Sequence, residues 1–123
     1  MSVSANNKLK SSKAIDHLFS KGSYIKISEY SLVYMKQQKE NPAGLRVGFS
    51  VGKKTQPLAV ERNKTKRVLR EAFRSSFSNF FSLEKTFFNV MILYNNPSPP
   101  SFIDASEKLN SLLLSFSESI TNG

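Results

Sequence analysis

The chain has 123 residues and contains no cysteine. It can therefore form neither a disulfide nor a thiolate metal site, and it suits a reducing compartment. Acidic residues are also scarce: nine Asp and Glu stand against eighteen Lys and Arg, so the formal net charge is +9. Such an excess of positive charge favours a polyanionic partner, either a nucleic acid or an anionic membrane surface.

Long apolar runs are missing as well. No stretch approaches the roughly 20 apolar residues that a membrane span needs, and the N-terminus lacks the apolar core of a secretory signal. We therefore expect a cytoplasmic protein with no membrane partner. The length favours a single domain over residues 1–123, with flexible ends at about 1–8 and 121–123.

The motifs of a self-sufficient enzyme are absent. The carboxylates are scattered as single residues, and there is no Ser/His/Asp set, no P-loop and no glycine-rich nucleotide fingerprint. His17 is expected at the surface of the first helix. We predict no catalytic residue and no metal site in this chain, so any catalytic groups come from another molecule.

The apolar pattern predicts helices alternating with strands. Strands are expected at residues 30–36, 45–51 and 87–94. Helices are expected within residues 9–22, where Gly22 is the stop signal, from 57 to 77 or 81, and at 101–120. Ser11 or Ser12 is the expected N-cap of the first helix, and Pro57 is placed in the first turn of the second. Ser101 and Asp104 are spaced as a capping box. The strand–helix–strand unit implies a parallel strand pair and an α/β two-layer sandwich.

The strand at 45–51 alternates cleanly between two faces. One face carries Leu45, Val47, Phe49 and Val51, and the other carries Arg46, Gly48 and Ser50. The second face is small and polar, which leaves room for another molecule to lie against it. Lys53 and Lys54 follow at the end of this strand.

Positive charge is concentrated in residues 53–74, which hold eight cations and two carboxylates, a net charge of +6. At about 100° per residue, six side chains of the second helix share an arc of roughly 140°: Arg62, Asn63, Lys66, Arg67, Arg70 and Arg74. Like charges four residues apart destabilise an isolated helix by about 0.2–0.5 kcal/mol per pair. Phosphates would offset this cost, and arginine forks suit them. A merely solvated face is the alternative, and a membrane-surface helix is disfavoured because its opposite face belongs to the core.

Aromatic residues on or next to the helix and strands that precede this helix include Phe19, Tyr30, Tyr34 and Phe49. Core packing explains most of them, Phe49 in particular. For Phe19 and Tyr34 the alternative is stacking on unpaired bases, which contributes about 1–3 kcal/mol per base. A sheet face with aromatic and small polar residues, rimmed by Lys53 and Lys54, would suit a single strand of nucleic acid.

Two neighbouring segments resemble the protein subunit of bacterial ribonuclease P. They are RVGFSVGKK at residues 46–54 and ERNKTKRVLREAFR at residues 61–74. The family hallmark R-N-x-x-K-R-x-x-R-E is completely filled, by Arg62, Asn63, Lys66, Arg67, Arg70 and Glu71. The likeness extends over most of the chain, including Phe19 and Gly22 at the close of the first helix and the leucine-rich final helix.

The resemblance implies both a fold and a function. The fold would run helix, three strands, helix, strand, helix, with a four-stranded sheet and a left-handed β-α-β crossover. The protein would bind ribonuclease P RNA and precursor tRNA, whose 5′ leader the complex removes. The RNA, with Mg²⁺ that it mainly binds itself, would carry out the hydrolysis, and the free protein is expected to be a monomer.

The resemblance also implies two binding surfaces. The basic helix, through Arg62, Asn63, Lys66, Arg67, Arg70 and Arg74, would dock on the catalytic RNA. The space between the first helix and the sheet would hold the single-stranded leader, through Phe19, Tyr34, Ser50, Lys53 and Lys54.

Several positions depart from the family pattern. The segment KKTQPLAVERN is one residue longer than in many relatives and lacks their glycine. Family roles are therefore not carried over to Thr55–Leu58. Asn95 and Asn96 follow the last strand, where a basic residue is common. Ile15 stands where many relatives have an aromatic residue, so stacking by the first helix rests on Phe19.

The alignment of residues 22–34 with the family pattern is open by one residue, so Tyr30 competes with Tyr34 for the leader surface.

Three other functions compete with the ribonuclease P assignment. A ribosomal protein or RNA chaperone would have similar charge. A DNA-binding module is disfavoured because no short helix and turn precede the basic helix. A nuclease in its own right lacks catalytic residues.

Overall fold

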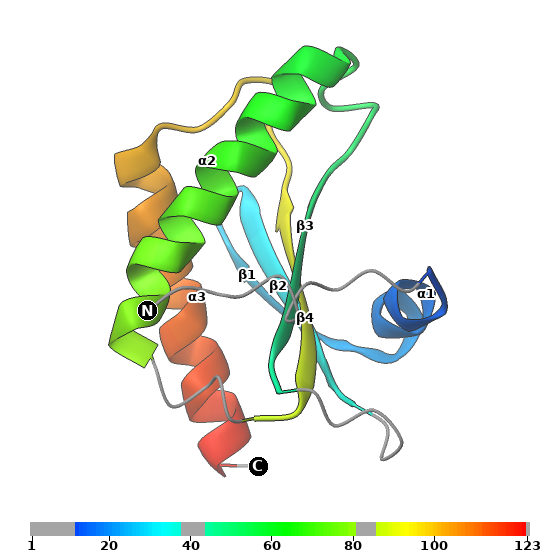
Figure 1. Cartoon of the computed structure of the whole chain (residues 1–123), viewed down its shortest axis with the longest axis vertical. Helices are drawn as coiled ribbons and strands as arrows, with labels where there is room; N and C mark the ends of the chain where they lie inside the picture. Colours follow the sequence, from blue (N-terminus) through cyan, green and yellow to red (C-terminus); the bar gives the residue numbers. More distant parts are fainter. Residues whose placement is uncertain (1–11, 38–43, 81–85, 123) are drawn as a thin grey trace.

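The structure is a computed structural model that describes residues 12–37, 44–80 and 86–122 (Figure 1). In chain order, the elements are α1 (Ser12–Lys21), β1 (Ser23–Ile27), β2 (Tyr30–Lys36), β3 (Arg46–Val51), α2 (Ala59–Phe77), β4 (Phe88–Tyr94) and α3 (Phe102–Asn122). This order confirms the helix, three strands, helix, strand, helix arrangement.

The four strands form one mixed sheet in the order β1-β2-β4-β3. The pairs β1–β2 and β2–β4 are antiparallel, whereas β3 and β4 are parallel. Helix α2 connects β3 to β4, so the predicted strand–helix–strand unit with its parallel pair is confirmed.

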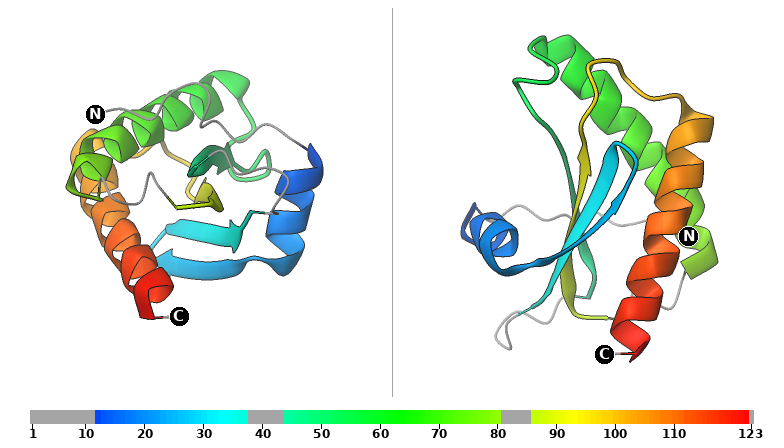
Figure 2. Two further views of the ribbon diagram at one scale, coloured as in Figure 1. Left: turned by 60° about the horizontal axis from the view of Figure 1, so that its bottom comes forward. Right: turned by 180° about the vertical axis from the view of Figure 1, so that it is seen from behind.

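Helices α2 and α3 cover one face of the sheet, and α1 lies against the other (Figures 1 and 2). The sheet with α2 and α3 forms the predicted two layers, and α1 adds a short helix on the far side. We call the two sides of the sheet the helix-pair face and the α1 face. No helix in the described ranges is both long enough and apolar enough to cross a membrane.

Alternation along each strand assigns side chains to these two faces. The helix-pair face holds the main core, in which Leu32, Val47 and Ile92 pack with Phe73 of α2 and Leu109 of α3. Leu45, Phe49 and Val51 belong to the same core, as the alternation of residues 45–51 predicts.

On the α1 face a smaller cluster joins Leu18 of α1 to Val33 and Met91, with Ile15, Met35 and Leu93 packed against it. Ile15, the residue that replaces a common aromatic, therefore contributes to the packing of α1 on the sheet.

The boundaries of the predicted elements differ from the structure in a few places. Strand β1 was not predicted from its own residues, because SYIKI is only five residues long and shows too short an alternation of polar and apolar residues. Helix α2 begins at Ala59, so the placement of Pro57 in its first turn is wrong by two residues. Helix α3 continues to Asn122, beyond the expected end at residue 120. Ser11 lies outside the described residues, and Ser12 is the first residue of α1.

Gly22 joins α1 to β1 at a point where the two elements approach closely. Its N–H donates to Leu18 O at 2.7 Å, which closes the last turn of α1. A Cβ at this position would lie 2.4 Å from Leu18 O, 2.8 Å from Val33 Cγ2 and 3.0 Å from Tyr34 O. Two of these three atoms belong to the backbone and cannot rotate away, so glycine is required for α1 to sit on the sheet.

Replacing Gly22 with alanine is therefore expected to destabilise the fold by about 1–3 kcal/mol, the usual cost of overpacking. The measurement is urea unfolding followed by circular dichroism. Gly52→Ala is the matched control, because its added Cβ meets only Thr55 Oγ1 at 3.6 Å. Equal losses in the two variants would contradict the close-approach explanation.

Candidate nucleic-acid interface

The basic residues of α2 lie on the side of the helix that faces away from the core. The buried side consists of Thr65, Leu69, Ala72, Phe73, Ser76 and Phe77. Asn63, Arg67, Arg70 and Arg74 are exposed, and Arg62 and Lys66 are partly buried. Among the residues that the structure describes, none of these cations forms an ion pair with a carboxylate. The predicted arc is thus a row of five cations and the amide of Asn63 on the outer side of α2, and we call these six residues the α2 basic row.

Arg62 differs from the other members of the α2 basic row because its guanidinium also binds its own chain. Its Nη1 donates to Gln56 O at 2.9 Å and to Pro57 O at 2.8 Å. It therefore holds the segment before α2 against the first turn of the helix. Leu58, the N-cap residue, supplies no side-chain hydrogen bond there.

Gln56 is the buried centre of a polar network at the start of α2. The side chain is 1% exposed. Its Oε1 accepts from Thr65 Oγ1 at 2.9 Å, and its Nε2 donates to Asn96 O at 2.9 Å. A buried amide must satisfy its donors and acceptors, so these bonds fix the loop between β3 and α2.

The same loop is bound a second time to the segment after β4, because Thr55 Oγ1 donates to Asn95 Oδ1 at 2.8 Å. Thr55, Gln56, Asn95 and Asn96 are all among the positions that the sequence comparison above gave as departures from the pattern of the family that the chain resembles. The structure therefore brings the two departures together in one contact. The sequence did not identify Gln56, although a glutamine among apolar and turn residues was a possible signal.

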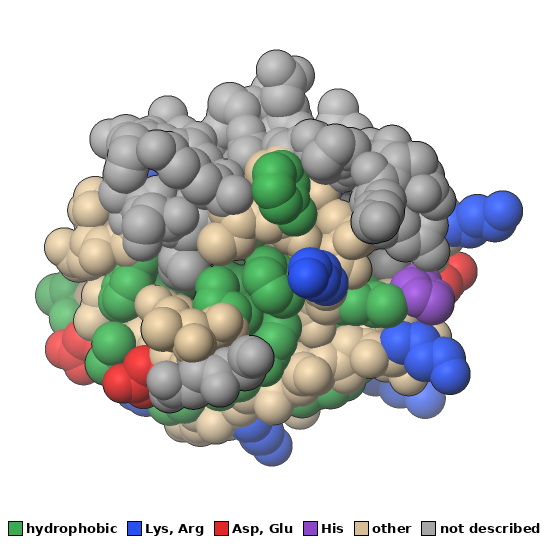
Figure 3. Space-filling view, turned by 90° about the horizontal axis from the view of Figure 1, so that it is seen from below, with side chains coloured by type: hydrophobic (Ala, Val, Ile, Leu, Met, Phe, Trp, Pro, Cys, Tyr) green, Lys and Arg blue, Asp and Glu red, His purple; other side chains and the backbone are tan. Residues whose placement is uncertain are grey.

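Of the five residues predicted for leader binding, Phe19 and Ser50 lie on the α1 side of the sheet, and Lys53 and Lys54 lie beyond the end of β3. Phe19 is in the last turn of α1 and is 37% exposed. Ser50 is partly exposed on β3, on the side opposite to Phe49. Lys53 and Lys54 are exposed in the turn that follows β3. In Figure 3, Lys and Arg side chains project from the side of the molecule on which α1 lies.

Tyr34 does not lie there, so its predicted place on the leader surface is wrong. Its ring packs in the main core, 5.0 Å from the ring of Phe116 and 6.1 Å from that of Phe88, centroid to centroid. Tyr30 is four residues away on the same strand and so lies on the same face, fully buried. Neither tyrosine of β2 therefore lies on the α1 face, because only residues an odd number of positions away on the strand point to the opposite side.

The aromatic residue that β1 presents on the α1 face is Tyr24, which the sequence did not single out. It pairs with Val33 of β2, a member of the α1-face cluster, and it is 54% exposed. Lys26, two residues further along β1, lies on the same face and is exposed. The signal was the alternation of residues 23–27, which is visible once that stretch is recognised as a strand.

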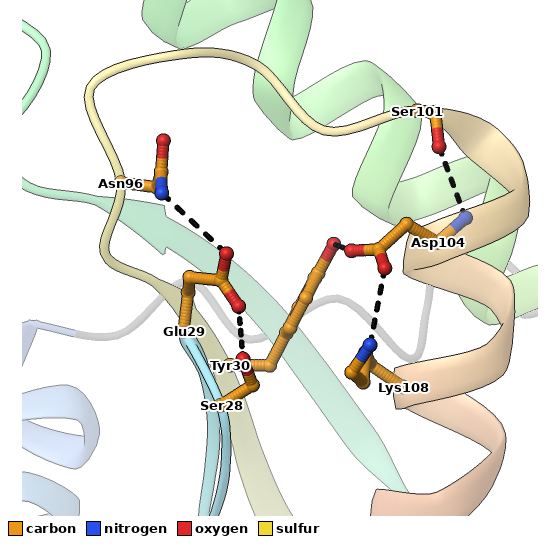
Figure 4. Close-up of polar contacts among 7 residues, drawn as sticks. All are labelled: Ser28, Glu29, Tyr30, Asn96, Ser101, Asp104 and Lys108. Carbon is orange, nitrogen blue, oxygen red and sulfur yellow. Dashed lines mark hydrogen bonds and ion pairs between the residues drawn. The ribbon is translucent and has the colours of Figure 1, made fainter.

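A separate polar cluster anchors the start of α3 to β2 (Figure 4). The buried Tyr30 hydroxyl donates to Asp104 Oδ2 at 2.7 Å, and Lys108 Nζ lies 3.0 Å from Asp104 Oδ1. The Asp104 N–H donates to Ser101 Oγ at 3.1 Å, which confirms the predicted Ser101 cap. The Asp104 carboxylate binds Tyr30 and Lys108, so it serves the tertiary fold.

The electrostatics of this cluster are those of a structural anchor. Burial, and then the hydrogen bond to Asp104, raise the pKa of Tyr30 far above its usual range. The Tyr30 hydroxyl, and then Lys108, lower the pKa of Asp104. Ser28 donates to Glu29 nearby, and this hydrogen bond is the main cause that lowers the pKa of Glu29. Within the described ranges, no three His, Cys, Asp or Glu side chains gather in a way that could hold a metal ion.

Comparison with known proteins identifies relatives over nearly the whole chain. The family model named Ribonuclease P matches residues 3–116. A ribonuclease P protein component from Vesicomyosocius okutanii is 32% identical over 123 residues, covering 98% of this chain and 99% of the relative. One from Chlorobaculum tepidum is 42% identical over 64 residues, covering 50% of this chain and 42% of the relative.

Solved structures share the fold. The RNase P protein of Staphylococcus aureus matches with a TM-score of 0.68 at 23% identity, over 87% of this chain and 92% of that one. The RNase P protein of Thermotoga maritima matches with a TM-score of 0.65 at 21% identity, over 86% and 94%.

The Tyr30–Asp104 contact generates a pH-dependent prediction. Tyr30→Phe should lower the free energy of unfolding by about 1 kcal/mol near neutral pH, because it removes one hydrogen bond to a carboxylate. Asp104 is 44% exposed, so solvent screening limits the effect. A lowered folded-state pKa stabilises the fold above the ordinary value of 3.8, and this contribution disappears as the pH falls.

The measurement is urea unfolding of wild type and variant from pH 7 down to about pH 3, and the difference between their stabilities should shrink as the pH falls below 3.8. Tyr34→Phe serves as the control, because no hydrogen bond of the Tyr34 hydroxyl is found among the described residues. A gap that stays constant down to about pH 3 would show that Asp104 ionisation is not involved.

Proposed function

The chain belongs to the ribonuclease P protein family, and we propose that it is the RNA-binding protein subunit of a ribonuclease P that removes the 5′ leader of precursor tRNA. The observation that carries this proposal is the hallmark motif on α2, whose side chains form the α2 basic row on the side of the helix that faces away from the core. Cations without carboxylate partners retain their full charge for phosphates, and arginine forks can bind them in a bidentate manner.

We assign docking on the catalytic RNA to the α2 basic row. Asn63, Lys66, Arg67, Arg70 and Arg74 supply the contacts, while Arg62 has the additional task of holding the loop before the helix. Because α2 covers the helix-pair face, this row points away from the sheet and from α1.

We assign the leader to the α1 face, on the other side of the sheet. Phe19 offers an exposed ring for stacking on a base, Ser50 offers a hydroxyl, and Lys53 and Lys54 offer cations. Tyr34 is not part of this surface, because its ring lies in the core. The protein thus presents one surface to the catalytic RNA and another to the substrate.

Hydrolysis belongs to the RNA subunit in this proposal, with magnesium ions that the RNA mainly binds. The described residues offer no cluster that fits a resident metal. The role of the protein is to hold the leader and to neutralise phosphate charge. We further propose that the free protein is a monomer and that it acts in the cytoplasm.

Reconstitution with a bacterial ribonuclease P RNA tests the proposal. The protein should accelerate cleavage of precursor tRNA at low magnesium and should bind precursor more tightly than mature tRNA, because only the precursor carries a leader. The protein alone should leave the precursor intact. No effect on cleavage together with equal affinity for both tRNAs would favour a ribosomal protein or an RNA chaperone.

Arg67→Ala isolates the α2 basic row. It should weaken binding to the catalytic RNA and reduce the slope of log affinity against log salt by about one, the value expected for one lost phosphate contact. Stability should be unchanged, because Arg67 is exposed.

Arg62→Ala is the informative comparison. It removes two hydrogen bonds to the loop before α2, so it should lower both RNA affinity and the urea midpoint. If the Arg67→Ala protein binds the catalytic RNA like wild type at every salt concentration, the assignment of RNA docking to α2 is wrong.

A further inference from the structure

Tyr24 and Lys26 of β1 extend the α1 face to the edge of the sheet. Ile25 and Ile27 pack against the main core, so their neighbours Tyr24 and Lys26 point to the opposite side. This side is the one on which α1 lies and to which Phe19 and Ser50 belong.

The Tyr24 ring is both exposed and held in place. More than half of the side chain is exposed, yet its hydroxyl donates to Phe19 O at 3.0 Å. This bond joins the far end of the side chain to the last turn of α1. The ring is therefore restrained before any ligand arrives, which lowers the entropy that binding would cost.

Among the residues that the structure describes, Phe19 and Tyr24 form no ring–ring contact with each other, whereas six other aromatic pairs do. Each of the two rings can therefore offer a face to a separate base. Aromatic residues in such positions bind single strands with little sequence preference, because every base has a π-face.

A row of paired strand residues connects Lys26 of β1 to Ser50 of β3. Lys26 pairs with Ser31, Ser31 with Leu93, and Leu93 with Ser50. The row crosses all four strands, a distance of about 14 Å at the usual strand spacing. Lys26 at one end and Lys53 and Lys54 beyond the other can each neutralise a phosphate.

From this arrangement we propose that Tyr24 stacks on a second base of the leader, with Lys26 beside it, so that the leader crosses the α1 face from β3 to β1. The inference rests on the proposed function and adds to it a residue that determines the preference for leader-bearing substrate. The occupant is single-stranded RNA, since the surface combines exposed rings with cations and the chain has a net charge of +9.

The test uses the reconstituted holoenzyme and compares its affinity for precursor and mature tRNA. Tyr24→Ala should reduce the preference for precursor roughly tenfold, as expected for one lost stacking contact. Tyr24→Phe keeps the ring but loses the bond to Phe19 O, so it should retain most of the preference. Tyr34→Phe, on the helix-pair face, should behave like wild type.

A scan of the leader with single abasic nucleotides adds a second readout. In wild type, one position should lose affinity when its base is removed, and in Tyr24→Ala the same removal should cost nothing further, as in a double-mutant cycle.

Full preference for precursor in Tyr24→Ala would overturn the inference. So would a loss in Tyr24→Phe equal to that in Tyr24→Ala, because Tyr24 would then act only as an anchor for α1. A wild-type holoenzyme without any preference for precursor would overturn the proposed function itself, and the inference with it.

Discussion

The packing of α2 and α3 over one face of the sheet is the interaction on which the rest of the structure depends. Burial of Phe73, Leu109 and Phe116 against the strands decides which side chains face inward, since a strand alternates with a period of two. It also turns the cationic side of α2 outward, because the same helix must place Leu69 and Phe73 in the core. The positions of both proposed RNA surfaces follow from this one contact.

Much of the fold could be predicted because its patterns are local. Residues 30–36 are rich in β-branched and aromatic residues and form β2 at those bounds, and the alternation of residues 45–51 matches β3. The α2 basic row could be predicted because a helix places every third and fourth residue on one side. The short β1 could not, since five residues carry too little pattern to distinguish a strand from a turn.

The surface proposed for the leader was predicted less well, for a physical reason. Composition identifies residues 30–36 as a strand rich in aromatic residues, but only register and packing decide which face of the sheet each side chain occupies. Tyr30 and Tyr34 lie on the helix-pair face, in the main core. The contact between Gln56 and the segment after β4 was also out of reach, because residues 56 and 96 are brought together only by the tertiary fold. That contact gives the altered loop a structural explanation: Thr55 and Gln56 find their partners in Asn95 and Asn96.

The central claim is that the protein binds the catalytic RNA with α2 and the leader with the opposite face of the sheet. The absence of cysteine allows a direct measurement, because a single introduced thiol can carry a photo-crosslinker. Attached through Ser75→Cys, which is exposed on α2, the crosslinker should label ribonuclease P RNA in the holoenzyme. Attached through Ser31→Cys on the α1 face, it should label the leader of bound precursor tRNA. Labelling of the same RNA from both positions would contradict the account.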